Sequence, residues 1–185
     1  RSPLRLGDLA VVQGAGPIGL LTLQWVRADG AGRIIVVEPD EGRAALARRL
    51  GADIVVSPGD EATTTVLEAS NGVGADLVYE CVGRNDTVQV AVDLARRGGA
   101  MSLIGLAEGE APINPSSWLT KEITVQGALA YTHEEFAMAM GMIADGRVDV
   151  DSLHTRTVSL DSFDQVMAEL AEGGTGETKV LVDPR

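Results

Sequence analysis

Three glycines in one short turn are the residues whose spacing most directly suggests chemistry. The segment from Gly14 to Gly19 reads GAGPIG and fits the pattern G-x-G-x-x-G. In such a turn the first glycine forms the tight bend, the second, Gly16, lets the backbone approach a pyrophosphate, and the third lets helix and strand pack closely. Pro17 and Ile18 follow Gly16, and proline suits the first turn of a helix because no helical hydrogen bond is donated there. The turn therefore predicts a pyrophosphate site.

The segments on either side of the turn strengthen this prediction. An apolar run at residues 9–12 predicts a buried strand, residues 17–28 a helix, and residues 34–37 a second strand. The N-terminus of the helix would present free N–H groups and the positive end of its dipole to the pyrophosphate. Glu38 closes the second strand 19 residues after Gly19, near the roughly 20-residue spacing at which an acid meets an adenosine ribose. A lone glycine turn also occurs for packing alone, but together these features predict a dinucleotide site.

The remaining candidates for catalysis form no recognisable set. His133 and His154 are the two histidines, and neither has a cysteine or carboxylate at a metal-ligand spacing. Cys81, the single cysteine, has no histidine or basic cluster nearby in the sequence to activate a thiolate. It is better interpreted as a small buried residue at the end of a strand. The sequence therefore predicts no catalytic residue and no metal ligand in this chain.

Strands and helices alternate through most of the sequence. Short apolar strands are predicted at residues 9–12, 34–37, 53–56, 76–81 and 100–104, with helices between them at 17–28, 39–50, 61–70 and 86–95. Nearly continuous apolar strands between amphipathic helices imply a parallel sheet covered on both faces. With right-handed crossovers this gives an α/β, doubly wound parallel sheet, the Rossmann fold, with its ligand crevice at the carboxyl ends of the strands.

The pattern changes after Gly109. A longer loop with a short helix near Trp118 precedes a predicted strand at 123–129, which would be the last strand on its side of the sheet. A helix at 134–144, a strand at 155–160, a helix at 161–171 and a strand at 179–182 exceed what one doubly wound domain needs. We therefore predict a dinucleotide-binding domain at residues 1–133 and a C-terminal α/β appendage at residues 134–185.

Composition limits the expected partners. The 185-residue chain carries a formal net charge of −12, which opposes binding to nucleic acid or to anionic membranes. No apolar run approaches the roughly 20 residues needed to span a bilayer, so a soluble protein is expected. The single cysteine excludes an internal disulfide and suits a reducing cytoplasm.

Several segments, taken in order, resemble one family. They are GAGPIGLL, Glu-x-x-x-x-Arg from Glu38 to Arg43, ARRLGAD, GADLVYECVG, GGAMSLIGL, GRVDV and the closing GETKVLV. Their order and spacing resemble the medium-chain, zinc-type alcohol and polyol dehydrogenases, and the likeness runs from Leu6 to the C-terminus. The resemblance implies NAD as the cofactor and hydride transfer between a zinc-bound alcohol and the nicotinamide.

The resemblance also implies roles at the adenosine end of the crevice. Glu38 binds the hydroxyls of the adenosine ribose, and Arg43 lies beside the same ribose. Cys81 and Val82 line the adenine side or the middle of the crevice.

At the other end, the resemblance implies that Ile104, Gly105 and Leu106 border the nicotinamide, and that Lys179 approaches the pyrophosphate from the C-terminal tail. Members of the family carry a further N-terminal, GroES-like domain with the zinc ligands and the proton relay. None of that pattern occurs in this sequence, so zinc is expected only in a longer parent protein, and this chain alone is expected to be inactive.

Three functions remain open. The first is the NAD(H)-binding part of an alcohol or polyol dehydrogenase, and the second is a non-catalytic NAD-binding or regulatory module. The third is a methyltransferase dependent on S-adenosylmethionine, which is disfavoured because those enzymes usually have an acid just before the glycine turn, where this chain has Gln13.

The strand at 123–129 predicts self-association. Its alternation of apolar residues leaves an open sheet edge, which a two-fold related copy can remove by continuing the sheet. The family resemblance points to the same contact, so we expect a homodimer or a tetramer.

Overall fold

Six parallel strands form the central sheet of the computed structural model, which describes residues 2–172 and 176–185. The strand order is β3-β2-β1-β4-β5-β6, and all five pairings are parallel. The strands are β1 (Leu9–Gln13), β2 (Arg33–Val37), β3 (Ile54–Val56), β4 (Ala75–Glu80), β5 (Ala95–Leu103) and β6 (Thr124–Gly127). This topology confirms the predicted doubly wound α/β fold.

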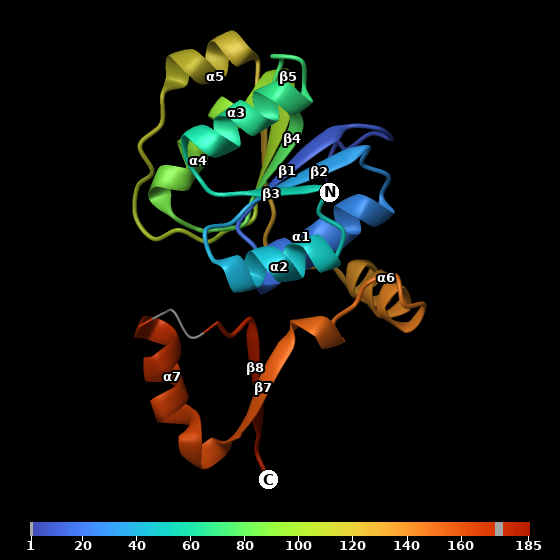
Figure 1. The fold of residues 1–185 in the computed structure, drawn as a ribbon, viewed down its shortest axis with the longest axis vertical. Coiled ribbons are helices and arrows are strands. Elements are labelled where there is room, and N and C mark those ends of the chain that lie inside the picture. Colours follow the sequence, from blue (N-terminus) through green and yellow to red (C-terminus); the bar gives the residue numbers. More distant parts are fainter. Residues whose placement is uncertain (1, 173–175) are drawn as a thin grey trace.

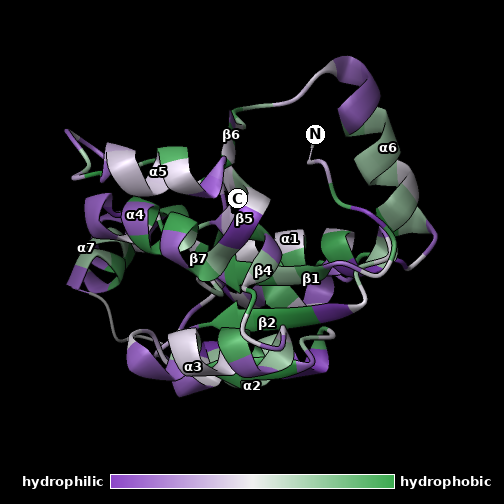
Figure 2. Cartoon of the chain, turned by 90° about the horizontal axis from the view of Figure 1, so that it is seen from above, coloured by the Kyte–Doolittle hydropathy of each residue, from purple (hydrophilic) through white to green (hydrophobic). Residues whose placement is uncertain are grey.

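Helices cover both faces of the sheet (Figure 1). On one face, α1 (Pro17–Ala28) and α2 (Glu41–Arg49) pack Leu20, Leu23 and Leu46 against the strands. On the other face, α3 (Asp60–Ala69) and α4 (Asn85–Leu94) contribute Val66 and Val92. Strand residues alternate between the two cores because successive side chains of a strand point to opposite faces. The apolar strands and inward helix faces share the hydrophobic colour in Figure 2.

Strand β5 begins earlier than the sequence predicts. The predicted helix ran to residue 95 and the predicted strand began at residue 100, but β5 starts at Ala95 directly after α4. The pairing with β4 shifts between the Ala75–Ala95 and Leu77–Ala100 contacts. Gly98 adopts a φ of +67° in this irregular stretch, where glycine is favoured. Residues 96–99 are arginines and glycines, which suggest a loop. The early start of β5 was therefore not predicted, because these residues form no apolar run.

The elements after β5 lie in different parts of the molecule. Helix α5 (Pro115–Lys121) precedes β6 and lies at the top of Figure 1, whereas α6 (His133–Ala144) follows β6 and lies beside α1. Beyond α6 come two short 3-10 helices (Asp151–Leu153 and Leu160–Ser162), β7 (His154–Ser159), α7 (Phe163–Glu172) and β8 (Lys179–Asp183). Strands β7 and β8 form their own parallel two-stranded sheet, which projects away from the central sheet in Figure 1.

A reciprocal pair of hydrogen bonds attaches the segment after α6 to α1. The side-chain Nε2 of Gln24 donates to the carbonyl of Asp149 at 3.0 Å, and the backbone N–H of Asp149 donates to Gln24 Oε1 at 2.6 Å. Gln24 is buried, as are Val148 and Leu153 on either side of Asp149. The amide of Gln24 thus fixes this segment on the helix that follows the glycine turn.

Among the described residues, no helix is both long and apolar enough to cross a bilayer.

Candidate functional site

The carboxyl ends of four strands gather most of the predicted site residues. The chain runs from β1 outward to β3 and then returns to place β4 on the other side of β1. In open α/β sheets, ligands bind at this switch point, outside the carboxyl ends of the strands. The predicted residues here follow β1, β2, β4 and β5 respectively: Gly14 to Gly19; Glu38; Cys81 and Val82; and Ile104 to Leu106.

The glycine turn has a different requirement at each glycine. Gly14 adopts a φ of +86°, and its N–H donates to the carbonyl of Val37 at 2.8 Å. A Cβ on Gly19 would lie 1.9 Å from the carbonyl oxygen of Gly14, so only glycine lets α1 begin so close to the turn. A Cβ on Gly16 would meet no atom within 4 Å. Packing therefore fixes Gly14 and Gly19, whereas the space beside Gly16 is open to a ligand.

The N-terminus of α1 can accept an anion. Gly16 is the N-cap residue, Pro17 occupies the first turn, and no side chain of the described residues caps this end. The first N–H groups of a helix lack helical partners, and together with the helix dipole they favour a negatively charged group. The geometry of this turn therefore fits a pyrophosphate without any basic side chain.

Glu38 is buried beside the turn, with 6% of its surface exposed. Its Oε2 accepts a hydrogen bond from the N–H of Ala15 at 2.7 Å, and its Oε1 accepts one from the N–H of Asp40 at 3.0 Å. The carboxylate thus holds the glycine turn and the start of α2 together. Each carboxylate oxygen has two lone pairs, so acceptor capacity remains for a ribose hydroxyl.

Arg43 lies in the first turn of α2. Its N–H donates to Oδ1 of Asp40, the N-cap residue of this helix, at 2.8 Å. Its side-chain Nε is buried and has no hydrogen-bond partner among the described residues. This guanidinium nitrogen, five residues after Glu38 in the sequence, is a donor to which a ligand could bind.

Cys81 and Val82 follow β4 and differ in exposure. Burial raises the pKa of the Cys81 thiol to about 12, so the group is protonated at neutral pH and is no nucleophile. Its sulfur lies 3.7 Å from Oγ1 of Thr22 on α1. Val82 is 41% exposed, and its Cγ2 lies 3.0 Å from where a Cβ of Gly14 would be. Cys81 therefore packs behind the crevice, and Val82 lies at its surface.

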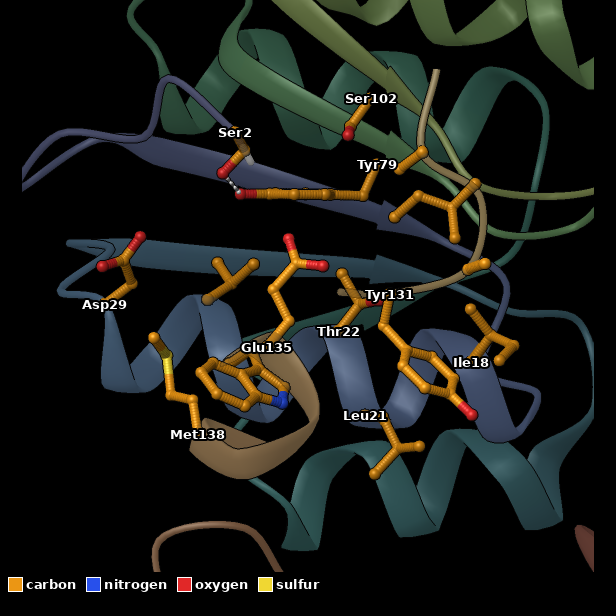
Figure 3. Close-up of a pocket in the computed structure, with 15 residues that line it drawn as sticks. Ser2, Ile18, Leu21, Thr22, Asp29, Tyr79, Ser102, Tyr131, Glu135 and Met138 are labelled. Atoms are coloured by element: carbon orange, nitrogen blue, oxygen red, sulfur yellow. Dashed lines mark hydrogen bonds between the residues drawn. The ribbon is translucent and has the colours of Figure 1, made fainter. Parts of the chain in front are cut away.

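A cavity of about 500 Å³ continues the crevice between α1, the ends of β4 and β5, and α6 (Figure 3). Ile18, Thr22 and Ile104 line it, together with Ala128 and Ala130 from the segment after β6. Leu106, in contrast, is 82% exposed outside this lining. The sequence did not predict the two alanines, because small apolar residues carry no chemical signal. Ala130 has a φ of +56°, a conformation that is uncommon for a residue other than glycine.

The opposite end of this cavity is polar. The hydroxyl of Tyr79 lies 2.8 Å from Oγ of Ser2, and Asp29 lines the same end (Figure 3). Burial is the main cause that raises the pKa of Tyr79 to about 12. Trp25 and Met138 also line the cavity. The cavity therefore combines apolar walls with polar groups, among them Glu135 near its centre and the hydrogen-bonded pair of Tyr79 and Ser2 (Figure 3).

Lys179 stands apart from the other predicted residues. It begins β8 and pairs with His154 of β7, so it belongs to the two-stranded sheet and not to the sheet whose carboxyl edge carries the glycine turn. Its carbonyl accepts a hydrogen bond from Oγ1 of Thr155 at 3.1 Å. The approach of Lys179 to a pyrophosphate remains a prediction.

Glu80 is a buried residue of this site that the sequence analysis missed. It ends β4, and its backbone carbonyl accepts hydrogen bonds from the N–H groups of Ile104 and Gly105, at 3.0 and 2.8 Å. The sequence did contain a signal for Glu80, because it is an acid at the end of an apolar strand, as Glu38 is directly after β2.

In the part of the chain that the structure describes, no three His, Cys, Asp or Glu side chains gather as metal ligands. His133 opens α6, and Nε2 of His154 lies 2.8 Å from Oγ1 of Thr157 in β7. The two histidines are thus on different elements.

Comparisons with known proteins agree on one family. A family model described as zinc-binding dehydrogenase matches residues 17–145. An L-idonate 5-dehydrogenase of Vitis vinifera is 32% identical over 173 residues, which cover 89% of this chain and 46% of that protein. The structure of 2R,3R-butanediol dehydrogenase from Bacillus subtilis matches with a TM-score of 0.87 and 31% identity, over 100% of this chain and 53% of that one.

A structure from Sinorhizobium meliloti, solved with bound NADP, matches with a TM-score of 0.89 and 30% identity, over 99% of this chain and 54% of that chain. The present chain thus spans about half the length of the proteins that it matches.

Proposed function

Because the chain belongs to the zinc-binding dehydrogenase family, we propose that it is the NAD(H)-binding part of an enzyme that oxidises an alcohol or polyol to a carbonyl compound. The observation that carries this proposal is the glycine turn, where an open face at Gly16 adjoins the uncapped N-terminus of α1. Nicotinamide dinucleotides, when bound, supply the group that accepts or donates a hydride. The residues of this chain then bind and orient that cofactor.

Each part of the cofactor has a group of the chain suited to it. The pyrophosphate would bind the free N–H groups at the start of α1, with Gly16 allowing close approach. The adenosine ribose would donate hydrogen bonds to Glu38, with Arg43 beside it and Val82 against the adenine side. Lys179 is proposed to reach the pyrophosphate from the C-terminal segment.

The nicotinamide would lie in the cavity that Ile18 and Ile104 line, next to Gly105 and Leu106. Apolar walls there would exclude water from the ring and fix which face of it a substrate meets. The backbone amides of Ile104 and Gly105 donate to the carbonyl of Glu80, which holds this wall of the cavity against β4.

The substrate and the metal belong to the proposal for the whole protein. Catalytic zinc needs three protein ligands and an open fourth position, and the described residues offer no such cluster. The zinc ligands of the proposed enzyme would therefore lie outside this chain. Idonate and butanediol, named in two of the matching proteins, support an alcohol or polyol as the substrate class.

The cofactor choice, assembly and location are proposed on separate grounds. Glu38 supports NAD over NADP because a carboxylate repels a 2′-phosphate, although one matching structure contains NADP. The open edge of β6 supports a homodimer or tetramer. The single cysteine, which allows no internal disulfide, supports a cytoplasmic location.

A non-catalytic NAD-binding module is the alternative, since the dinucleotide residues and no metal cluster are found among the described residues. Both functions require that the purified chain bind NADH. Titration with NADH, followed by the rise in nicotinamide fluorescence, is the direct test, and S-adenosylmethionine is the control ligand. Binding of S-adenosylmethionine without NADH would overturn both. Joining the chain to the rest of its parent and measuring alcohol oxidation then separates the enzyme from the module.

A further inference from the structure

Glu80 is a fully buried carboxylate that the proposed cofactor contacts do not use. Its Oε1 accepts three hydrogen bonds: from the N–H of Val82 at 2.9 Å, from the N–H of Gly83 at 3.0 Å, and from Oγ1 of Thr87 at 2.8 Å. Its Oε2 has no hydrogen-bond partner among the described residues. One oxygen therefore holds the turn between β4 and α4, and the other faces a different neighbour.

That neighbour is Gly105, in the segment after β5. A Cβ on Gly105 would lie 2.5 Å from Oε2 of Glu80 and 2.3 Å from the backbone nitrogen of Gly83. Gly83 in turn has a φ of +76°, and its Cβ would lie 2.9 Å from the carbonyl oxygen of Leu106. The two turns thus touch backbone to backbone, with the Glu80 carboxylate directly against their contact.

The backbone of Glu80 acts on the same segment. Its carbonyl accepts from both Ile104 and Gly105, so one residue bonds to the turn after β4 through its side chain and to the segment after β5 through its main chain. Ile104 lines the cavity proposed for the nicotinamide, whereas Val82 is proposed to line the adenine side or the middle of the crevice. Glu80 is therefore placed between the two halves of the crevice.

We propose that Glu80 is a positioning residue for the nicotinamide end of the cofactor site. Its side chain fixes the Val82–Gly83 turn, which supports Gly105 and so sets the position of the cavity wall at Ile104. This inference rests on the proposed function, since it concerns where the nicotinamide binds. It differs from a role in stability alone, because it requires the two ends of the cofactor to respond unequally.

The test compares NADH with AMP, a ligand that lacks the nicotinamide. In Glu80→Ala, the N–H groups of Val82 and Gly83 lose their acceptor, the Thr87 hydroxyl keeps only the carbonyl of Arg84, and the turn is expected to move. We expect the dissociation constant for NADH to rise by about tenfold or more and that for AMP by less than about threefold, because AMP would contact only Val82 of the displaced segments and is expected to bind mainly through Glu38. The fluorescence enhancement of bound NADH is expected to fall as well.

Glu80→Gln is the conservative variant. Its amide oxygen can accept the same three hydrogen bonds, so we expect NADH affinity within about threefold of the wild type. Glu68→Ala and Glu68→Gln, at an exposed position of α3, are matched controls and should change neither ligand. Thermal unfolding of each variant shows whether it is folded under the conditions of the titration.

If Glu80→Ala does not fold, Thr87→Val removes one of the three donors and leaves the carboxylate in place. It should weaken the binding of NADH more than that of AMP, as Glu80→Ala does, but by a smaller factor. Thr63→Val on α3 serves as its control. Equal losses for NADH and AMP, or a Glu80→Gln variant as weak as the alanine variant, would overturn the inference while leaving the proposed function intact. A wild-type chain that binds neither ligand would instead reject the proposed function itself.

Discussion

At the scale of single residues, the glycines of the turn make the sharpest prediction. Gly16→Ala adds a methyl group where no atom lies within 4 Å, so thermal stability should stay near that of the wild type. NADH affinity should nevertheless fall by about tenfold, because the methyl group would occupy the space proposed for the pyrophosphate. Gly19→Ala places its Cβ 1.9 Å from a carbonyl oxygen and should destabilise the fold by about 1–3 kcal/mol.

Thermal unfolding and NADH titration of both variants test this contrast. A Gly16→Ala protein with wild-type affinity would remove the pyrophosphate from this turn. A Gly19→Ala protein as stable as the wild type would show that the close approach of α1 is not required.

Glu38 determines the expected choice of cofactor. Its carboxylate can accept hydrogen bonds from ribose hydroxyls but repels a 2′-phosphate, a difference of about 2 kcal/mol or about thirtyfold in affinity. Because Glu38 also accepts from Ala15 and Asp40, Glu38→Ala should weaken both cofactors as well as reduce the preference. Titrations with NADH and NADPH measure this, with Glu41→Ala as an exposed control on α2. Equal affinities of the wild type for both cofactors would contradict the assignment.

Some residues of the candidate site could be predicted from the sequence and others could not. The spacing of Gly14, Gly19 and Glu38 predicted correctly that they meet at one edge of the sheet, because the strand-turn-helix unit fixes them locally. Glu80 was missed because its importance depends on Gly83 and Gly105, which only the paired strands bring into contact. Ala128 and Ala130 were missed because a cavity wall of small residues has no pattern of its own.

At the scale of elements, the edge strand β6 predicts a dimer. The sheet ends at β6, and Val125 in this strand is partly exposed. Unpaired strand edges favour pairing with another copy, so we expect a dimer at micromolar concentrations by light scattering. Proline at position 125 and, separately, at position 126 should identify the contact, because alternate N–H groups of a strand point to opposite neighbours.

In one of these two variants, the proline removes an N–H that points away from β5, toward the proposed partner. That variant should keep its thermal stability and become monomeric. Val125→Thr, which retains the backbone donor, is the control and should remain dimeric. A wild-type monomer, or a dimer that persists in both proline variants, would place the contact elsewhere.

Element types were easier to predict than their limits. The alternation of strands and helices was correct, since apolar strands and amphipathic helices have distinct periods. The start of β5 at Ala95 was wrong by several residues, because pairing through an irregular Arg-Gly stretch depends on β4 and not on local pattern. The 3-10 turns at Asp151–Leu153 and Leu160–Ser162 were also absent from the prediction, since such short helices have no periodic signal.

At the scale of the whole molecule, we expect the chain alone to bind a dinucleotide but to turn over no alcohol. Hydride transfer in this family is proposed to need an alcohol polarised on a metal beside the nicotinamide, and the described residues provide no metal cluster. NADH binding should survive with reduced affinity, because the zinc-bearing part of the proposed enzyme would add contacts to the nicotinamide. Metal analysis combined with NADH titration and an alcohol-oxidation assay measures all three properties. Stoichiometric zinc together with turnover would show that the active site has been misplaced.

The link between Gln24 and Asp149 bears on where this protein can be cut for expression. A fragment ending at residue 133, where the sequence places its domain boundary, would strip α6 from the cavity and leave the buried amide of Gln24 without its two partners. Leu153, which packs in the core beneath α1 and α2, would be lost as well. The smallest fragment that retains these contacts therefore ends after Leu153, and it lacks β8 together with the pyrophosphate contact proposed for Lys179.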